Sequence, residues 1–325
     1  MISIAMATYN GEKFIEKQLR SILDQTLQVD EMIICDDCSS DNTVEIIKNF
    51  IDSNNISNWK LIVNDKSLGC SRNFSKAVGQ CKGDLIFLAD QDDIWENNKI
   101  EIMTNIMNER QDIYALNCMS SFIDDNDNFM DIPQDRSGNI LKSSLYNKPK
   151  KEYHWRGCCM VFRSELNSYI KNIYNAEACF TYYDAYVALT AMALNGFYIL
   201  DLNLIRYRLH GGNTYGTIPY FEEGKMSLSE KITVMKSKVD SIDIRFSEAK
   251  DSKKEFLSIL NILSKYHELD LSEFKRYCAF NINRYNYMSE MKISNIFKYI
   301  KPLGKSVIGD TLWILRAKRR NKSVK

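Results

Sequence analysis

The 325-residue sequence has no run of about 18 apolar residues, the length that a membrane-spanning helix needs, so no transmembrane segment is predicted. It also has no charge excess, because 43 basic and 42 acidic side chains nearly cancel, and nucleic acid is not indicated as a partner. The GxGxxG dinucleotide motif and the P-loop motif are both missing. The first residues lack the basic segment and apolar core of a signal peptide, so we expect a cytoplasmic protein.

Paired cysteine motifs of the kind that bind zinc are missing as well. The nine cysteines are an odd number and lie mostly within apolar segments. Cys35 and Cys38 form one CxxC motif, but no second CxxC or CxxH pair completes a zinc site. We therefore expect free thiols in a reducing compartment. Hydrophobic residues at 45% and charged residues at 26% are typical of a globular chain and exclude disordered and collagen-like classes.

The first 115 residues alternate short apolar runs with amphipathic stretches. The spacing predicts strands at residues 2–6, 31–35, 59–63 and 85–89, and helices at 12–25, 43–54, 72–80 and 95–108. Strict alternation predicts βαβ units, and therefore an α/β fold with a mostly parallel central sheet and flanking helices. In such folds ligands bind beyond the carboxyl ends of the strands, where this sequence places Thr8, Asp37 and Asp90.

The pattern changes twice further along the chain. Residues 116–220 are mixed and include a polar loop at 124–128, whereas long helical stretches such as 228–250 and 254–265 follow residue 220. We predict one domain over 1–220 that changes from regular alternation to a mixed pattern at about residue 115. A helical region over 221–325 follows it.

The last segment, residues 291–325, is basic and partly apolar. It carries ten Lys or Arg and one acidic residue, Asp310, interspersed with aliphatic and aromatic residues. This mixture suits an amphipathic segment at an anionic membrane surface. It equally suits a packing helix with a solvated basic end, and the sequence leaves both interpretations open.

The segment Asp90-Gln91-Asp92-Asp93 places three carboxylates directly after an apolar strand. Such charges repel one another unless a cation is present, and oxygen ligands favour Mg²⁺ or Mn²⁺. The alternative is an acidic turn that caps the next helix. Asp37, at another strand end, is suited to accept hydrogen bonds from a nucleobase or ribose.

Five motifs occur in the order and spacing of one enzyme family: MATYNG at 6–11, SILDQT at 21–26, DDCSSDNT at 36–43, GCSRN at 69–73 and ADQDDIW at 89–95. The chain resembles the inverting glycosyltransferases of family 2, which have the GT-A fold. The ADQDDIW form most resembles a bacterial rhamnosyltransferase subgroup that builds surface polysaccharide. Two later segments, YDAY at 183–186 and YRLHGGN at 207–213, are similar to the same subgroup. The resemblance covers residues 1–216, and it implies a nucleotide-binding half at about 1–115 and an acceptor-binding half at about 116–220 of the predicted domain.

The resemblance implies roles for individual residues. It places a nucleotide sugar over Thr8, Tyr9, Asp37, Arg72 and Asp90. It implies that Asp92 binds Mn²⁺ or Mg²⁺, with His210 as a further metal ligand, although a lone histidine is also often an ordinary hydrogen-bonded residue.

The same resemblance makes Asp184 the catalytic base and assigns Trp95, Trp155 and Gly157 to acceptor binding. Trp155 could equally be an aromatic residue packed at a domain edge. The subgroup usually has His-Asp-Trp-Trp where this chain has Tyr-Asp-Ala-Tyr, so the carboxylate persists while its neighbours differ.

The implied function is metal-dependent transfer of a sugar from a nucleotide donor, dTDP-rhamnose first and a UDP-hexose next, to a saccharide acceptor that is lipid-linked. The enzyme would then work in the cytoplasm, with peripheral contact to the membrane. A non-catalytic sugar-binding or nucleotide-sugar-binding module on the same fold is the main alternative. A nucleotidyltransferase is a third, but it would want a Gly/Arg/Lys-rich phosphate loop near the first strand.

Overall fold

The computed structural model describes residues 1–130, 136–143, 156–170, 183–210, 257, 260–261, 263–266 and 271–290. The chain divides into two compact units. One comprises Met1–Asn172 with Phe180–Thr217, and the other comprises Ile173–Cys179 with Ile218–Lys325. In the second unit the longest described element is helix α9, Ser272–Glu290.

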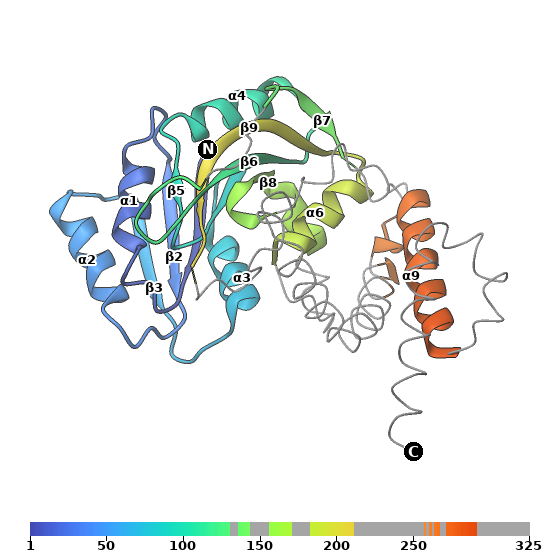
Figure 1. The fold of residues 1–325 in the computed structure, drawn as a ribbon, viewed down its shortest axis with the longest axis horizontal. Coiled ribbons are helices and arrows are strands. Elements are labelled where there is room, and N and C mark those ends of the chain that lie inside the picture. Colours follow the sequence, from blue (N-terminus) through green and yellow to red (C-terminus); the bar gives the residue numbers. More distant parts are fainter. Residues whose placement is uncertain are drawn as a thin grey trace, which may run out of the picture. The chain divides into compact units, whose positions relative to one another are not determined.

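The first unit begins with strands and helices in alternation (Figure 1). Their order is β1 (Ile2–Thr8), α1 (Ile15–Leu23), β2 (Glu31–Asp36), α2 (Thr43–Ser53), β3 (Trp59–Val63), α3 (Cys70–Gln80) and β4 (Leu85–Ala89). The chain continues through β5 (Ile94–Trp95), α4 (Lys99–Glu109), β6 (Ala115–Ile123) and β7 (Ile140–Lys142). Then follow the 3₁₀ turns η1 (Gly157–Cys159) and η2 (Ser164–Leu166) on either side of β8 (Met160–Arg163), and finally α6 (Tyr183–Ala193) and β9 (Phe197–Arg208).

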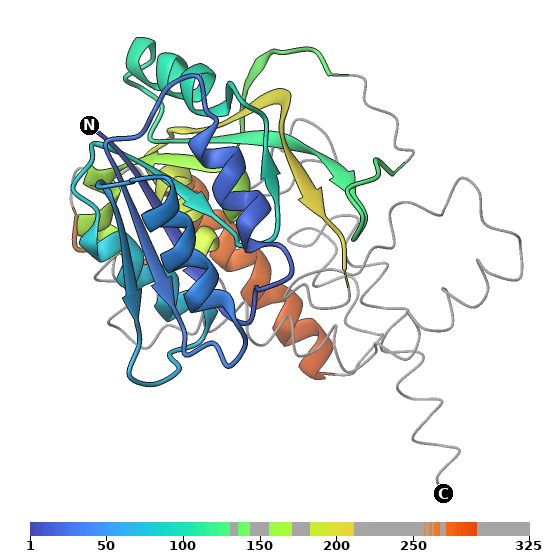
Figure 2. The ribbon, with the colours of Figure 1, turned by 90° about the vertical axis from the view of Figure 1, so that its left-hand side faces the viewer.

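The described strands form one sheet in the order β3-β2-β1-β4-β8-β6-β9-β5, with β7 paired to β9. The strands β3, β2, β1 and β4 run parallel. Beyond β4 the sheet is mixed, because β8 runs antiparallel to both β4 and β6, while β6 and β9 run parallel. In the view of Figure 2, α1 and α2 lie in front of the parallel strands.

The core lies between the sheet and its helices. All five residues of β4 are buried, as expected for a parallel strand that is covered on both faces. Helix α1 turns Ile15, Leu19 and Ile22 inward, the spacing of an amphipathic helix. On the other face α3 packs against β1 and β2 and also contacts α6.

The predicted α/β fold with a central sheet and flanking helices is confirmed. The sheet is less parallel than the alternation implied, because β8 and β5 pair antiparallel with their neighbours. The helix predicted at 95–108 begins instead at Lys99, since Ile94 and Trp95 pair with β9. The stretch predicted as helix at 228–250 lies outside the described residues, as does the basic segment 291–325.

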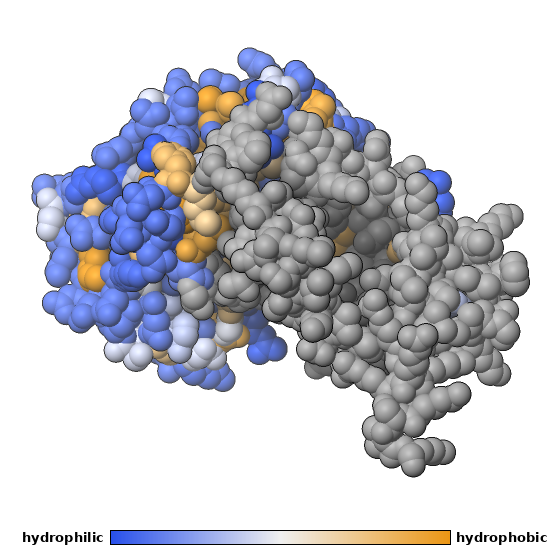
Figure 3. Space-filling view, viewed as in Figure 1, coloured by the Kyte–Doolittle hydropathy of each residue, from blue (hydrophilic) through white to orange (hydrophobic). Residues whose placement is uncertain are grey.

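The described part of the chain presents a mostly polar face in one view (Figure 3). Figure 3 shows hydrophilic residues over most of the coloured face, with hydrophobic ones in small patches. Within the described residues, no helix combines the length and apolar character needed to cross a membrane. The described cysteines are free thiols.

Candidate active site

The carboxyl ends of β1, β2 and β4 meet at one edge of the sheet. Thr8 pairs with Asp36 across β1 and β2, and Ala89 is the last residue of β4 to pair with β1. Asp37 and Asp90 each follow their strand by one residue, so they emerge at the same edge. The parallel register thus brings together polar residues that are distant in sequence, as the alternating pattern predicted.

Thr8 and Tyr9, both assigned to nucleotide binding, lie at the end of β1. Thr8 is buried, and its hydroxyl donates to Asp36 Oδ2 at 2.8 Å, so this side chain ties β1 to β2. The Tyr9 ring is 55% exposed, and its backbone N–H and carbonyl are bonded to the Gln91 side chain at 2.8 and 2.9 Å. The Thr8 side chain therefore has a structural contact, whereas the Tyr9 ring faces solvent at the rim.

Asp37 is held by four hydrogen-bond donors. Its Oδ1 accepts from the Asn64 amide at 2.8 Å and the Leu68 N–H at 2.7 Å, and its Oδ2 accepts from the Ser67 hydroxyl and the Gly69 N–H, both at 2.8 Å. Burial acts to raise the pKa of Asp37, but these donors outweigh it and hold the pKa below its usual value. Both oxygens therefore organise the loop of residues 64–69, and a nucleobase N–H would have to share them. The predicted contact between Asp37 and a nucleotide stays a prediction.

Arg72 lies in the first turn of α3 and is exposed. The next residue, Asn73, is buried and donates to the Cys35 carbonyl at 2.7 Å, which fixes the start of α3 against β2. Within the described part of the chain, no hydrogen bond or ion pair engages the Arg72 guanidinium. The predicted contact between Arg72 and a nucleotide stays a prediction.

Asp90 and Asp93 are carboxylates in an environment that disfavours their charge. Burial, together with the charges of Asp92 and Asp184, raises the pKa of Asp90 to about 8. Asp93 is fully buried, and burial followed by the charges of Asp92 and Asp90 raises its pKa well above the usual range. Its Oδ1 accepts from the Arg208 N–H at 3.0 Å, but its Oδ2 has no hydrogen-bond donor among the described residues.

Asp92 and His210, the two predicted metal ligands, are brought together although 118 positions separate them in sequence. The His210 Nε2 lies 2.8 Å from Asp92 Oδ2, and each side chain is 15% exposed. The Phe14 ring, 4.9 Å from the imidazole between centroids, packs beside His210. A nitrogen and an oxygen this close fit a shared divalent cation, and the crowded carboxylates around them would be stabilised by its charge.

A second set of possible ligand atoms lies next to this pair. One ligand atom each of Asp90, Asp93 and Cys158 lie within 4.8 Å of one another. The orphaned Oδ2 of Asp93 is consistent with a cation or a proton between these groups. The strand end therefore offers donors for a divalent metal ion from the residues after β4, from η1 and from the residues after β9.

Asp184, the predicted base, stands in the first turn of α6 and faces Gly157 of η1. Its Oδ2 accepts from the Gly157 N–H at 2.9 Å and its Oδ1 accepts from the Ala185 N–H at 2.8 Å. Burial, partly opposed by these donors, raises the pKa of Asp184 to about 6. A Cβ at position 157 would lie only 3.3 Å from the Asp184 Cβ, so the close approach of backbone to carboxylate favours glycine there.

Trp95, which was assigned to acceptor binding, lies instead inside the fold. Its side chain is 2% exposed and belongs to the hydrophobic core. The ammonium of buried Lys99 lies 3.5 Å from the indole centroid, so this face of the ring is covered and cannot stack on a sugar. Trp155, the other predicted aromatic contact, lies outside the described residues.

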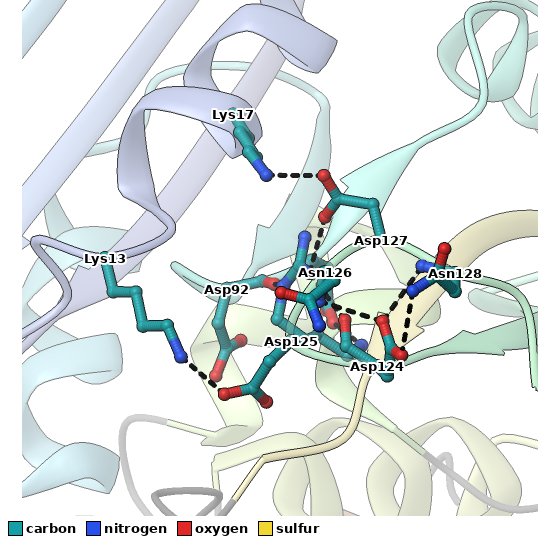
Figure 4. Close-up of polar contacts among 10 residues, drawn as sticks. Lys13, Lys17, Asp92, Asp124, Asp125, Asn126, Asp127 and Asn128 are labelled. Atoms are coloured by element: carbon teal, nitrogen blue, oxygen red, sulfur yellow. Dashed lines mark hydrogen bonds and ion pairs between the residues drawn. The ribbon is translucent and has the colours of Figure 1, made fainter.

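One feature of the site has no predicted role: a turn formed by Asp124–Asn128 after β6, which we call the acidic turn (Figure 4). Its carboxylates form ion pairs with Lys13, Lys17 and Arg208. The sequence marked 124–128 only as a polar loop, because the partners come from distant segments. The run of Asp and Asn directly after a strand was the one available signal.

Comparison with known proteins agrees with this geometry. The family model described as "Glycosyl transferase family 2" matches residues 3–170. The UDP-Glc:alpha-D-GlcNAc-diphosphoundecaprenol beta-1,3-glucosyltransferase WfgD of Escherichia coli is 36% identical over 107 residues, which are 33% of this chain and 41% of WfgD. The teichuronic acid biosynthesis glycosyltransferase TuaG of Bacillus subtilis, a putative assignment by its own name, is 28% identical over 41% of this chain and 54% of TuaG. The matches thus span about half or less of these relatives.

Two longer matches extend over most of the chain. The dTDP-rhamnosyl transferase RfbG of Shigella flexneri is 28% identical over 225 residues, 65% of this chain and 73% of RfbG. The crystal structure of Staphylococcus aureus TarS residues 1–349 with UDP-GlcNAc superposes with a TM-score of 0.59 at 17% identity, covering 95% of this chain and 81% of that one. The likeness to TarS shows the fold, which is the expected GT-A arrangement. Because the family model matches more than half of the residues of this chain, the chain belongs to glycosyl transferase family 2.

Proposed function

We propose that the chain is an inverting, metal-dependent glycosyltransferase that moves a sugar from a pyrimidine-nucleotide donor to a saccharide acceptor in bacterial surface polysaccharide synthesis. The observation that carries the proposal is Asp184. Its carboxylate is oriented by two backbone N–H groups, and its pKa is raised to about 6 by burial, close to the pH at which a general base must work.

In this proposal Asp184 takes the proton of the acceptor hydroxyl as that oxygen attacks the anomeric carbon. The Gly157 and Ala185 N–H groups hold the carboxylate in one orientation throughout. General-base catalysis of this kind contributes about 10²- to 10⁴-fold to the rate. A single displacement inverts the anomeric carbon, so no covalent intermediate with a Ser or Cys is required.

Asp92 and His210 are the residues that would hold the metal ion, Mn²⁺ or Mg²⁺, with Asp90 beside them. Bound there, the ion would stabilise the negative charge that develops on the departing nucleoside diphosphate. Phe14 limits the movement of the His210 ring by packing against it. Tyr9 and Arg72, both exposed at the rim, are proposed to contact the nucleotide.

For the donor we propose dTDP-rhamnose first and a UDP-hexose second. RfbG, the relative with the longer match, is a dTDP-rhamnosyl transferase by name, whereas WfgD is named for UDP-glucose and TarS was crystallised with UDP-GlcNAc. The nucleotide sugars named for these three proteins all contain a pyrimidine nucleotide. Asp37 would contribute by ordering the loop of residues 64–69 and by sharing an oxygen with the ring N–H of uracil or thymine.

For the acceptor we propose a lipid-linked saccharide. WfgD, by its name, acts on a sugar attached to diphosphoundecaprenol. In our proposal residues 1–115 hold the nucleotide, residues 116–220 hold the acceptor beside Asp184 and Gly157, and residues 221–325 form a helical region. Its basic segment would rest on the cytoplasmic face of an anionic membrane.

The test is donor hydrolysis by the full chain with Mn²⁺, measured as release of the nucleoside diphosphate. Candidate donors are dTDP-rhamnose, UDP-glucose, UDP-GlcNAc and GDP-mannose, and excess EDTA is the metal control. We expect release from at least one pyrimidine donor and none with EDTA.

Asp184→Asn is the matched variant for the catalytic role. It retains the shape of the side chain, so donor binding should persist, while transfer to an acceptor should fall at least about 10²-fold. Equal turnover by this variant would remove Asp184 from its role. Preference for GDP-mannose would show that the proposed pyrimidine nucleotide is wrong.

A further inference from the structure

The acidic turn is closed by hydrogen bonds of its own and carries two carboxylates that the proposed reaction does not use. Asp124 builds it, because its Oδ1 accepts from the Asn126 N–H at 2.8 Å and from the Asn128 N–H at 2.9 Å. The Asn128 carbonyl also accepts from the Asp124 N–H at 3.0 Å. The two remaining carboxylates, Asp125 and Asp127, point toward the lysines of the α1 region (Figure 4).

Three cations meet these two carboxylates, and they differ in burial. Lys13 pairs with Asp125 and Lys17 pairs with Asp127, but the two lysine side chains are 61% and 49% exposed, so solvent screens both pairs. Arg208 is fully buried, and its Nη1 lies 2.5 Å from Asp127 Oδ1. The Asp127 side chain is 34% exposed, but replacing it would leave the buried Arg208 charge without this partner, which makes this contact the sensitive one.

Arg208 connects the acidic turn to the candidate metal ligands. Its Nε donates to the Asp92 carbonyl at 2.8 Å, and its Nη1 donates to the Asp124 carbonyl at 2.8 Å. Its guanidinium also lies 4.5 Å from the centroid of the Phe14 ring, which packs beside His210. One side chain thus fixes the main chain of Asp92 and supports the ring next to His210.

We propose that Asp127 and Arg208 are positioning residues for the metal site: Asp127 holds the Arg208 guanidinium, and Arg208 holds the Asp92 main chain so that the Asp92 carboxylate stays beside His210. The inference rests on the proposed function, since it assumes that these two side chains bind the metal ion. Residues that orient metal ligands from outside the coordination sphere typically change metal affinity 10- to 100-fold when they are replaced.

The experiment measures Mn²⁺ affinity of the full chain in the presence of UDP, from the EPR signal of free Mn²⁺. Asp127→Asn keeps the volume and removes the charge, so we expect Mn²⁺ binding to weaken about 10- to 100-fold. Asp127→Glu restores the carboxylate and should recover most of the affinity. Asp112→Asn is the control, because Asp112 also pairs with an arginine, Arg110, but at an exposed surface.

The outcomes separate this inference from the proposed function. If the unaltered chain binds no Mn²⁺ with UDP, the proposed metal dependence fails and the positioning role fails with it. If the unaltered chain binds Mn²⁺ and Asp127→Asn binds it equally well, only the positioning role is overturned. Weaker binding by Asp127→Asn, recovery by Asp127→Glu and no change in Asp112→Asn would support it.

A general loss of folding is distinguished by a second variant and a second measurement. Arg208→Lys keeps a cation beside Asp127 but cannot reach both the Asp127 carboxylate and the Asp92 carbonyl. Circular dichroism at the same temperature gives the folded fraction of each variant. If Mn²⁺ binding by Asp127→Asn and Arg208→Lys falls only in proportion to that fraction, both residues merely stabilise the fold, and the positioning role is wrong.

Discussion

Replacing Asp184 by asparagine is expected to change how the stability of the protein depends on pH. Burial raises the pKa of this carboxyl from 3.8 to about 6, so between those values the folded protein holds a proton that the unfolded chain has released. Where the folded state binds more protons, the free energy of unfolding falls as the pH rises. The stability that the Asp184 carboxyl contributes is therefore fully present below pH 3.8, and this contribution is lost as the pH rises through about 6.

The magnitude follows from the size of the pKa difference and from the two N–H donors. A difference of about two pKa units corresponds to about 3 kcal/mol, and about 1.4 kcal/mol of it falls between pH 5 and pH 8. Asparagine avoids this loss, but its single acceptor oxygen serves only one of the Gly157 and Ala185 N–H groups. Leaving the other unsatisfied costs about 1–3 kcal/mol at every pH. Asp184→Asn should therefore be less stable than the parent at pH 5. The gap between their free energies of unfolding should then shift in favour of Asp184→Asn as the pH rises.

The assay is urea unfolding followed by circular dichroism at several values from pH 5 to pH 8. The informative quantity is the difference in the free energy of unfolding between the parent and Asp184→Asn. This difference should change by about 1.4 kcal/mol across this pH range. Asp112→Asn is a suitable control, because its hydrogen bond from Arg110 lowers the pKa of Asp112 and keeps it ionised throughout. Parallel curves for the parent and Asp184→Asn would refute the raised pKa, and with it the argument for a base poised near neutrality.

Three further predictions use other parts of the molecule. The rate of transfer should fall on the acid side of a pH of about 6 as Asp184 is protonated, and a profile flat down to pH 5 would contradict the assigned base. Trp95→Ala should destabilise the fold by about 3–5 kcal/mol in urea unfolding, because the ring is buried; an altered acceptor KM with unchanged stability would instead restore its predicted acceptor role. The full chain should sediment with anionic liposomes more than a version ending near Met291, and equal sedimentation would favour the packing interpretation of the basic segment.

The sequence was sufficient to predict the parallel half of the fold because local patterns determine it. Apolar runs such as β4 are separated by amphipathic helices, and each helix is long enough to cross back over the sheet. The mixed half was not predictable in the same way. The two-residue strand Ile94–Trp95 is recognisable only by its pairing with β9, more than 100 residues later, so the local pattern indicated a helix there.

The candidate site was predictable to a similar degree. Strand ends placed Asp37, Asp90 and Asp92 at one edge, and the family resemblance added Asp184 and His210 to them. The sequence did not indicate which partners each side chain contacts in the folded protein. The four donors to Asp37 arise from loop geometry, and the burial of Trp95 depends on Lys99 covering its ring. Such contacts are tertiary, and no local pattern encodes them.

The balance of charge at the site leads to a last prediction, that a nucleotide binds weakly without a divalent cation. The raised pKa values of Asp90 and Asp93, which lie beside Asp92 at one strand end, mean that this end already disfavours negative charge, and a diphosphate would bring more of it. Lys13 and Arg208, two cations at this rim, already pair with the acidic turn.

At an effective dielectric constant of about 20, two like charges about 4 Å apart repel by about 4 kcal/mol, so a single close contact of this kind would weaken binding by more than 100-fold. Isothermal titration of the full chain with UDP, with and without Mn²⁺, measures the effect directly. Equal affinities would mean that the protein's own cations, Arg72 among them, suffice to hold the diphosphate, and the argument from charge crowding at Asp90 and Asp92 would be wrong.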